Sequence, residues 1–444
     1  MKKQIIYALI ALLIGTGAQA QIPEQLSLEQ AISLSLANNP EIKIQQKQVD
    51  LAANEYFAGN AGLVPTISLI GNGSYQSNDT EAVIRTFQDF PPTIAVSDGA
   101  AATTTYSAVV QVDYALLGGF SGKYRYQLLN DERDLAFYRQ QSVMNRTILT
   151  VAELFLEIAK LQSQEELLEK NVAIGEERLS KVKDRLSFGQ ATGLAVLRAE
   201  TDLNRDRSSL DRVLVARNNL KRDLNFQIGI DASTDYRVTV AYAPPALLST
   251  ESLEQTVLAG NPDIQLSLKG VQVANHQFQL TNASRLPTVN AFANYGYFNQ
   301  ENDLQQLAEI RTVGYTVGIG LRYNIFNGGR TNRKIQSAKM NQEISQFRQQ
   351  ATQDRILADA IKAHHQLALL MGQLEREEQN IATFRESYLR TEERFSQGKA
   401  ASLDLRDAQN ALLNAEVTLS NLKADIMKSS LRLEALKGSI LRNE

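Results

Sequence analysis

The sequence predicts a mixed fold of long coiled-coil helices and transmembrane β-strands, in which each chain is a tandem repeat that supplies four strands. Three observations predict it. The chain contains the same pattern twice, four segments alternate between apolar and small or polar residues, and the segments between them carry a heptad of apolar residues. Alternation with a period of two indicates strands, and a sustained heptad is typical of coiled-coil helices.

The duplication is visible in motifs that recur at a constant offset. "NNPEI" at 38–42 recurs as "GNPDI" at 260–264, a shift of 222 residues. Beyond Tyr75 the shift becomes 209 residues, and it then places Gly189 on Gly398. The change predicts that the loop after Tyr75 is 13 residues longer than its counterpart. Each repeat reads helix, two strands, long helix, tip and return helix.

The first 20 residues have the features of a cleaved export signal. Lys2 and Lys3 precede a short apolar run at 5–14, and Ala18–Gln19–Ala20 offers a cleavage site. The run is short for a membrane-spanning helix, which favours cleavage over an uncleaved anchor. No segment after residue 20 approaches 18 consecutive apolar residues, so we expect no transmembrane helix in the exported chain.

Composition excludes several classes of partner and site. Removing the two signal lysines from 46 basic residues leaves 44 against 49 acidic residues, so nucleic acid is not an expected partner. The chain has no cysteine, which excludes a lipid anchor on cysteine, a disulfide framework and a thiolate metal site.

The predicted organisation is therefore a signal followed by two repeats, 1–20, 21–228 and 229–444. In the first repeat we expect strands at about 66–76 and 104–117, and a helical hairpin at about 120–228 with its tip near 188–194. In the second repeat we expect strands at about 288–298 and 312–326, and a hairpin at about 329–440 with its tip near 397–403.

The strand signal is strongest near the middle of the second repeat. Every odd position from 313 to 325 is large and apolar, and the even positions between them are small or polar. The apolar set is Val313, Tyr315, Val317, Ile319, Leu321, Tyr323 and Ile325. Because successive side chains of a strand point to opposite faces, this strand has one apolar face and one polar face.

The long helices carry a different period. From Ser121 to Leu186 no proline interrupts the chain, and 66 residues at a rise of 1.5 Å give a helix of roughly 100 Å. Its apolar residues follow an alternating spacing of four and three, as in Leu154, Ile158, Leu161, Leu168, Val172, Leu179, Val182 and Leu186. A heptad held this long predicts antiparallel coiled-coil packing of helices.

Four strands of about 11 residues cannot close a barrel, and an open sheet leaves two unpaired edges. The strands are long enough to cross a bilayer when tilted, and several chains contributing four strands each would close the barrel. The alternative is a half-buried sheet in an elongated soluble periplasmic coiled-coil scaffold or adhesin. No amphipathic segment is left over to cover the apolar face of the sheet, which favours the barrel.

The sequence resembles the TolC-like outer membrane efflux proteins, or outer membrane factors, over essentially the whole exported chain. The tandem repeats, "LSLEQAISLSLANNPEI", "YNIFNGGR" at 323–330 and the two glycine tips carry the resemblance. It implies a homotrimer in the outer membrane of a Gram-negative bacterium, in which a 12-stranded β-barrel among outer-membrane lipid continues as a 12-helix α-barrel into the periplasm.

The resemblance also implies a function. The trimer would be a passive exit duct of a tripartite efflux or type I secretion system, exporting small toxic compounds or proteins. Its partners would be a periplasmic adaptor, or membrane fusion protein, and an inner-membrane pump. The hairpin tips would contact the adaptor, through Gly189, Gln190, Leu194, Gly398, Lys399 and Leu403. A glycine in a tight turn between helices is needed whatever the function.

Asp404 and Asp407 stand three residues apart just after the second tip, and two interpretations of them stay open. They are suitable first-turn acids, because the helix dipole favours them there, and Ser402 is the expected N-cap. The resemblance instead implies a pore constriction, a ring of carboxylates around the three-fold axis. The salt-bridge lock that the family's best-known member has at its tips is not expected, because its positions hold Phe395, Ala400 and Ala195.

No catalytic constellation emerges, and we expect a protein that is not an enzyme and has no cofactor or metal site. His364 and His365 are adjacent on a helix and so diverge by about 100°. His276 stands alone on another helix.

Overall fold

The computed structural model describes residues 24–79, 82–85, 94–97, 100–118, 120–245, 249–303 and 308–440. The predicted signal, 1–20, lies outside the described residues. The chain divides into two compact units, a helical unit (1–47, 138–266 and 350–444) and a sheet unit (48–137 and 267–349). Each unit takes residues from both repeats, so the duplication does not produce two separate bodies.

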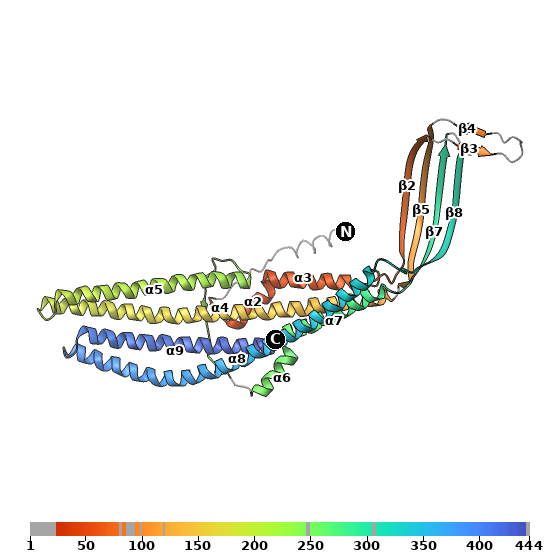
Figure 1. The fold of residues 1–444 in the computed structure, drawn as a ribbon. Coiled ribbons are helices and arrows are strands. Elements are labelled where there is room, and N and C mark those ends of the chain that lie inside the picture. The colour runs from red at the N-terminus through yellow and green to blue at the C-terminus, as the bar shows by residue number, and fades with distance from the viewer. Residues whose placement is uncertain are drawn as a thin grey trace, which may run out of the picture. The chain divides into compact units, whose positions relative to one another are not determined.

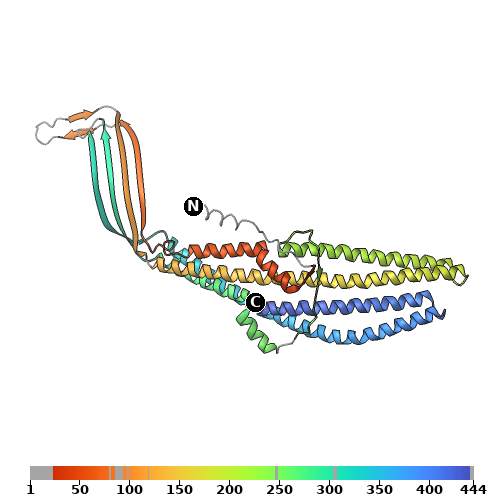
Figure 2. The ribbon, with the colours of Figure 1, turned by 180° about the vertical axis from the view of Figure 1, so that it is seen from behind.

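Within the described residues the helices form two long hairpins and four shorter segments. Hairpin 1 consists of α4 (Ser121–Ser187) and α5 (Gly193–Ile228), and hairpin 2 of α8 (Arg330–Ser396) and α9 (Ser402–Lys437). The shorter helices are α2 (Leu28–Asn38), α3 (Pro40–Glu55), α6 (Thr250–Gly260) and α7 (Pro262–Ala283). In the helical unit the long helices lie in the order α5, α4, α9, α8 (Figures 1 and 2). None of the helices in the described part of the chain is long and apolar enough to cross a membrane.

The main sheet has four antiparallel strands in the order β2–β5–β7–β8 (Figure 1). These strands are β2 (Thr66–Asp79), β5 (Ala100–Gly118), β7 (Thr288–Asn302) and β8 (Glu309–Arg322). Two short pairs accompany them, β1 (Gln25–Leu26) with β6 (Arg237–Val238) in the helical unit, and β3 (Ala82–Arg85) with β4 (Ile94–Ser97). The strands β3 and β4 belong to the longer loop predicted after Tyr75.

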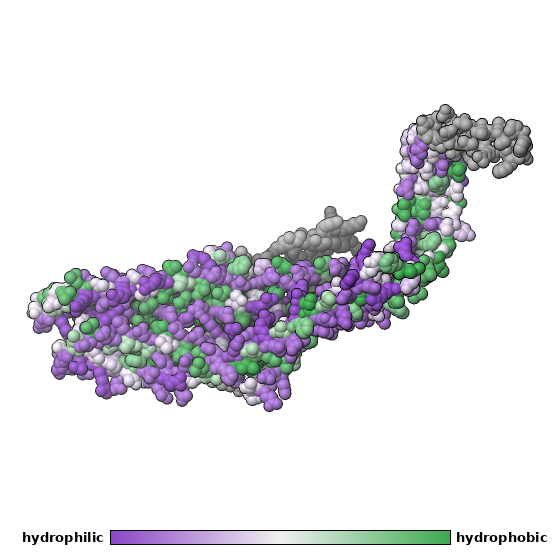
Figure 3. Space-filling model, in the orientation of Figure 1, coloured by the Kyte–Doolittle hydropathy of each residue, from purple (hydrophilic) through white to green (hydrophobic). Residues whose placement is uncertain are grey.

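The register places the alternating apolar positions of the four strands on one face of the sheet, whereas Ile70, Val109 and Phe292 lie on the other. Val317 lies opposite Ala293, which lies opposite Val112, which lies opposite Ile67. The neighbouring row, Thr316, Asn294, Gln111 and Ser68, belongs to the other face and is polar throughout. Figure 3 shows hydrophobic residues gathered along the sheet and at its base, whereas the helical hairpins are largely hydrophilic.

The last strand ends earlier than its alternation predicts. Tyr323 and Ile325 continue the apolar pattern, but β8 stops at Arg322, four residues before the predicted end at 326. Its neighbour β7 begins at Thr288, opposite Arg322, and the preceding residue Pro287 has no N–H to donate. Alternation in one strand therefore overestimated its length, because pairing needs a partner strand.

The repeated Asn-Pro motif has a structural role. The Asn39 side chain accepts a hydrogen bond from the Glu41 N–H (2.9 Å) and donates to the Gln227 carbonyl (2.9 Å) at the end of α5. Asn261 does the same with Asp263 (2.9 Å) and with the Leu436 carbonyl (2.9 Å) at the end of α9. Each asparagine side chain accepts from a free N–H at the start of one helix and donates to a free carbonyl at the end of another. It thereby joins a short helix to a return helix.

The two cores of the helical unit are also repeats of each other. The first packs Val151, Ile158 and Leu224 with residues of α2 and β6. The second packs Ala360, Leu367 and Leu433, the residues 209 positions later, with residues of α6. The heptad predicted from the sequence therefore supplies one buried core to each hairpin.

Candidate functional site

The two hairpin tips have the same backbone conformation. Gly189 (φ +71°) and Gly398 (φ +74°) are left-handed. The N–H of Gln190 donates to the Arg185 carbonyl (2.7 Å), and that of Lys399 donates to the Arg394 carbonyl (2.8 Å). No heavy atom lies within 4 Å of where a Cβ would stand on either glycine, so it is the φ angle rather than space that favours glycine.

The predicted adaptor-contact residues divide into two sets. Leu194 and Leu403 are 57% and 61% exposed and line one groove of about 670 Å³ between the starts of α5 and α9. The structure thus brings one residue of each tip together. Gly189, Gln190, Gly398 and Lys399 lie in the turns beyond this groove, where the Lys399 amine donates to the Gln397 side chain (2.9 Å).

Asp404 has a local role that the residue at the corresponding position of the first tip does not have. The N-cap of α9 is Ala401, not Ser402 as expected from the sequence, and Asp404 accepts a hydrogen bond from the Ala401 N–H (3.0 Å). In the first tip the N-cap Thr192 uses its own side chain, which accepts from the Ala195 N–H (3.3 Å). Asp407 is exposed, as is Asp404, and the spacing of three places both on one side of α9.

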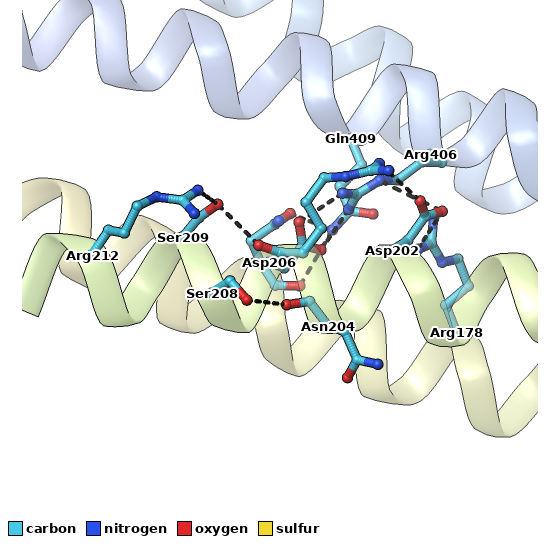
Figure 4. A network of polar contacts seen from close by, with 11 residues as sticks. Arg178, Asp202, Asn204, Asp206, Ser208, Ser209, Arg212, Arg406 and Gln409 are labelled. Carbon is cyan, nitrogen blue, oxygen red and sulfur yellow. Dashed lines mark hydrogen bonds and ion pairs between the residues drawn. The ribbon is translucent and has the colours of Figure 1, made fainter.

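The structure reveals a buried charge cluster near the tips that sequence reasoning missed (Figure 4). Arg406 of α9 forms two parallel hydrogen bonds to Asp206 of α5, at 2.7 and 2.6 Å. Both side chains are 8% exposed, and a second acid, Asp202, lies 4.0 Å from Arg406. Arg178 of α4, 2% exposed, donates to Asp202 at 3.3 Å. Paired in this bidentate way, the charges join hairpin 1 to hairpin 2.

The charge cluster belongs to a longer polar stripe on α4. Five residues, each seven after the last, face hairpin 2, namely Glu157, Gln164, Asn171, Arg178 and Arg185. Four of them contact hairpin 2 directly, at Lys428, Asn421, Gln409 and Phe395, and Arg178 reaches Arg406 only through Asp202, which lies near both. We call this contact the within-chain seam.

The two ends of the seam are strong contacts. The Arg185 guanidinium lies 4.3 Å from the Phe395 ring centre and donates to the Phe395 carbonyl (2.6 Å). At the far end burial alone would raise the pKa of Glu157, but hydrogen bonds from Lys160 and Lys428 hold that pKa below its usual value. Glu157 is thus ionised at neutral pH, and its pair with Lys428 keeps both charges.

A sequence signal for the seam existed in the seven-residue spacing of these polar residues. It is easily overlooked, because a polar stripe on a coiled-coil helix ordinarily faces solvent. His276 pairs with Asp131 in the sheet unit, and no cluster of three or more His, Asp or Glu residues able to hold a metal occurs among the described residues.

Comparison with known proteins decides the family. The sequence model of the outer membrane efflux protein family matches residues 31–226 and again 253–439. The chain belongs to the outer membrane efflux protein family. It is therefore an exit duct of the outer membrane that extends into the periplasm, and the soluble scaffold or adhesin is set aside.

Individual members of the outer membrane efflux protein family are distant from this chain. Outer membrane efflux protein BepC of Brucella suis is 22% identical over 334 residues, 74% of this chain and 71% of its own. The alkaline protease secretion protein AprF of Pseudomonas aeruginosa is 23% identical over 423 residues, 93% of this chain and 84% of its own.

Solved structures of the family share the fold. The outer membrane channel CmeC of Campylobacter jejuni has a TM-score of 0.79 and 16% identity, covering 93% of this chain and 85% of its own. The outer membrane protein VceC of Vibrio cholerae has a TM-score of 0.74 and 18% identity, covering 93% and 96%.

The buried pair predicts a large effect of one substitution. Arg406→Leu leaves the Asp206 carboxylate buried without its partner, and we expect it to destabilise the protein by about 3–5 kcal/mol. The measurement is the thermal midpoint of the detergent-solubilised protein by circular dichroism. Arg205→Leu is the matched control, since Arg205 is 67% exposed and its pair with Asp202 contributes at most about 1 kcal/mol. Equal midpoints for the two variants would contradict the assignment.

Proposed function

We propose that three copies of the chain assemble into a duct whose 12 strands close one barrel in the outer membrane. The observation that carries the proposal is the pair of open edges. The strands β2 and β8, each 14 residues long, have no neighbour on their outer sides among the described residues. They run in opposite directions, because each step across the four-stranded sheet is antiparallel. β8 of one copy can therefore pair with β2 of the next in the same antiparallel pattern.

The number of strands decides whether the barrel has an open lumen. Two copies would give about eight strands, a barrel that its own side chains fill, whereas three copies leave an open lumen. The apolar face of the sheet then contacts lipid and its polar face lines the passage. The exposure of Tyr315 (80%), Val317 (72%) and Ile319 (71%) in a single chain supports this assignment.

Two neighbouring positions of β8 test which face meets lipid. Val317→Lys puts a charge into the middle of the lipid-facing side, where it costs about 2–4 kcal/mol, and we expect loss of the heat-modifiable oligomer from outer-membrane fractions. Thr316→Lys, one residue away on the polar face, is the matched control and should assemble normally. Release of the unmodified protein by a salt wash, or equal tolerance of both lysines, would contradict the barrel.

The helical hairpins supply the rest of the duct. Two hairpins in each of three copies give 12 helices, which we propose form the periplasmic tunnel, with the tips at its entrance. Relatives with names such as "Toluene efflux pump outer membrane protein" and "Alkaline protease secretion protein" support a place in tripartite efflux or type I secretion. We infer that the duct is passive, without a catalytic step, and that an inner-membrane pump and a periplasmic adaptor deliver the cargo.

Exposed leucines at the tips suit an adaptor helix, because a helix docks through apolar side chains placed in a groove. We expect Leu194→Glu with Leu403→Glu to abolish cross-linking of the tips to the adaptor and to sensitise cells to exported compounds. Leu389→Glu is the control, since Leu389 is 55% exposed on α8 but away from the tips. A doubly substituted duct that still binds the adaptor would remove these leucines from the contact.

We also propose that Asp404 and Asp407 form the constriction of the entrance, one acid pair per copy around the axis. Carboxylates held close together repel one another and attract cations, which suits a selective narrow passage.

The test is to remove the charges while keeping the cap. Asp404→Asn retains an oxygen able to accept from the Ala401 N–H, so Asp404→Asn with Asp407→Asn isolates the effect of charge. In planar bilayers we expect weaker cation selectivity and less block by multivalent cations. Unchanged selectivity and block would mean that both acids serve only the first turn of α9.

A further inference from the structure

The end of the main sheet where its strands join the helices carries an excess of positive charge, and we call this end the base of the sheet. There β7 follows the end of α7, and β8 leads into the start of α8 (Figure 1). No acidic residue occurs from 264 to 300 or from 310 to 342, although the whole chain has a formal net charge of −3. In its second repeat the base therefore differs in sign from the protein as a whole.

Four exposed cations of the sheet unit make up this excess, and we call them the basic collar. They are Arg285, which follows α7, and Arg330, Arg333 and Lys334 at the start of α8. The spacing of three and four places the last three on one side of that helix. The Arg285 guanidinium donates to the Asn332 side chain (3.2 Å), so the end of α7 lies beside the start of α8. No ion pair neutralises any of the four in the part of the chain that the structure describes.

Exposed apolar side chains adjoin the basic collar. Ile325 and Phe326, in the connection between β8 and α8, are 88% and 83% exposed, and Leu286 beside Arg285 is 45% exposed. Arg322 is also exposed, but its even position in β8 places it on the polar face of the sheet, so it is not part of the collar. Apolar and basic groups side by side suit the boundary of a bilayer, where the former enter hydrocarbon and the latter reach the headgroups.

The duplication separates these two features. Ile325 and Phe326 correspond to Leu116 and Leu117, which are 46% and 56% exposed, so both repeats have apolar side chains at the base. The collar has no such equivalent. Its positions correspond in the first repeat to Leu63, Ser121, Tyr124 and Arg125, of which only the last is basic. Contact with hydrocarbon alone explains the apolar residues of both repeats but not the cations of the second.

The opposite end of the sheet carries the opposite charge. Glu301 and Glu309 lie opposite each other in the register of β7 and β8, and Asp79 ends β2. Arg311, a cation at that end, forms an ion pair with Glu309 (2.7 Å). Charge is thus separated along the strands. In the proposed duct the basic end meets the periplasmic side of the membrane, because the hairpins extend into the periplasm.

We propose that the basic collar binds the phosphate groups of anionic phospholipids in the periplasmic leaflet of the outer membrane, with Ile325 and Phe326 in the adjoining hydrocarbon. The proposal rests on the proposed barrel and adds to it a class of lipid and the residues that select that class. Guanidinium groups bind phosphate oxygens through paired hydrogen bonds, and each basic side chain near an anionic lipid surface favours association about fivefold. A zwitterionic headgroup carries its own cation beside the phosphate, so the collar prefers lipids without one.

Brominated lipids test the proposal, because bromine quenches a nearby indole and the natural chain has no tryptophan. Phe326→Trp places a single indole beside the collar. In phosphatidylcholine vesicles that contain a small, fixed fraction of one brominated lipid, we expect brominated phosphatidylglycerol to quench this indole more strongly than brominated phosphatidylcholine. Adding Arg330→Gln with Arg333→Gln should remove most of that preference and leave quenching by brominated phosphatidylcholine unchanged.

The matched control removes the same charge elsewhere on the same helix. Arg348→Gln with Arg355→Gln takes away two exposed cations of α8 that lie about 22 Å or more beyond Arg333, and it should keep the preference. Equal quenching by the two brominated lipids, or a preference that survives Arg330→Gln with Arg333→Gln, overturns the inference.

Two further outcomes identify the ligand and the level of failure. Loss of the preference when inorganic phosphate is added at constant ionic strength would mean that the collar binds free phosphate, and it overturns the assignment to lipid. Absence of quenching by either brominated lipid is instead the failure of the proposed barrel, because the base of the sheet would then lie outside the bilayer.

Discussion

The two edges of the sheet, which have no partner strand among the described residues, are the constraint on which the proposed duct depends. Four strands cannot curl into a closed barrel, and a bilayer offers no water to satisfy exposed N–H and C=O groups. The two edge strands are long and run in opposite directions, so in the proposed duct β8 of one copy pairs antiparallel with β2 of the next.

Duplication within the chain gives each copy two hairpins whose positions correspond at a shift of 209 residues. Inside a copy the contact has acquired buried, bidentate ion pairs, which hold only when both partners are present. At the shift of 209 residues the four charged residues of the cluster correspond to neutral ones, namely Leu197, Ala411, Ala415 and Ser387. Because the within-chain seam includes residues next to the tips, it links the two tips of a chain to each other.

Only the second tip is followed by the acid pair Asp404 and Asp407, which has a local explanation and a proposed functional one. Locally, Thr192 caps α5 with its own side chain, while Ala401 cannot cap α9 and Asp404 binds its N–H instead. Asp407 takes no part in that cap, and the constriction proposed for both acids stays a prediction. The tip glycines are explained by their left-handed conformation alone.

The sequence by itself determined the four long strands, the long helices, the duplication and the position of the tips, but it did not predict the short strands β1, β3, β4 and β6. It could determine the long elements and the tips because strand alternation, heptads and left-handed glycines are properties of neighbouring residues. It did not reveal that Arg406 meets Asp206, nor that β8 ends at Arg322. Those depend on which elements lie side by side and on how each long helix is rotated about its axis. Periodicity within one helix shows that a polar stripe exists, but only the tertiary structure decides whether that stripe faces water or another hairpin.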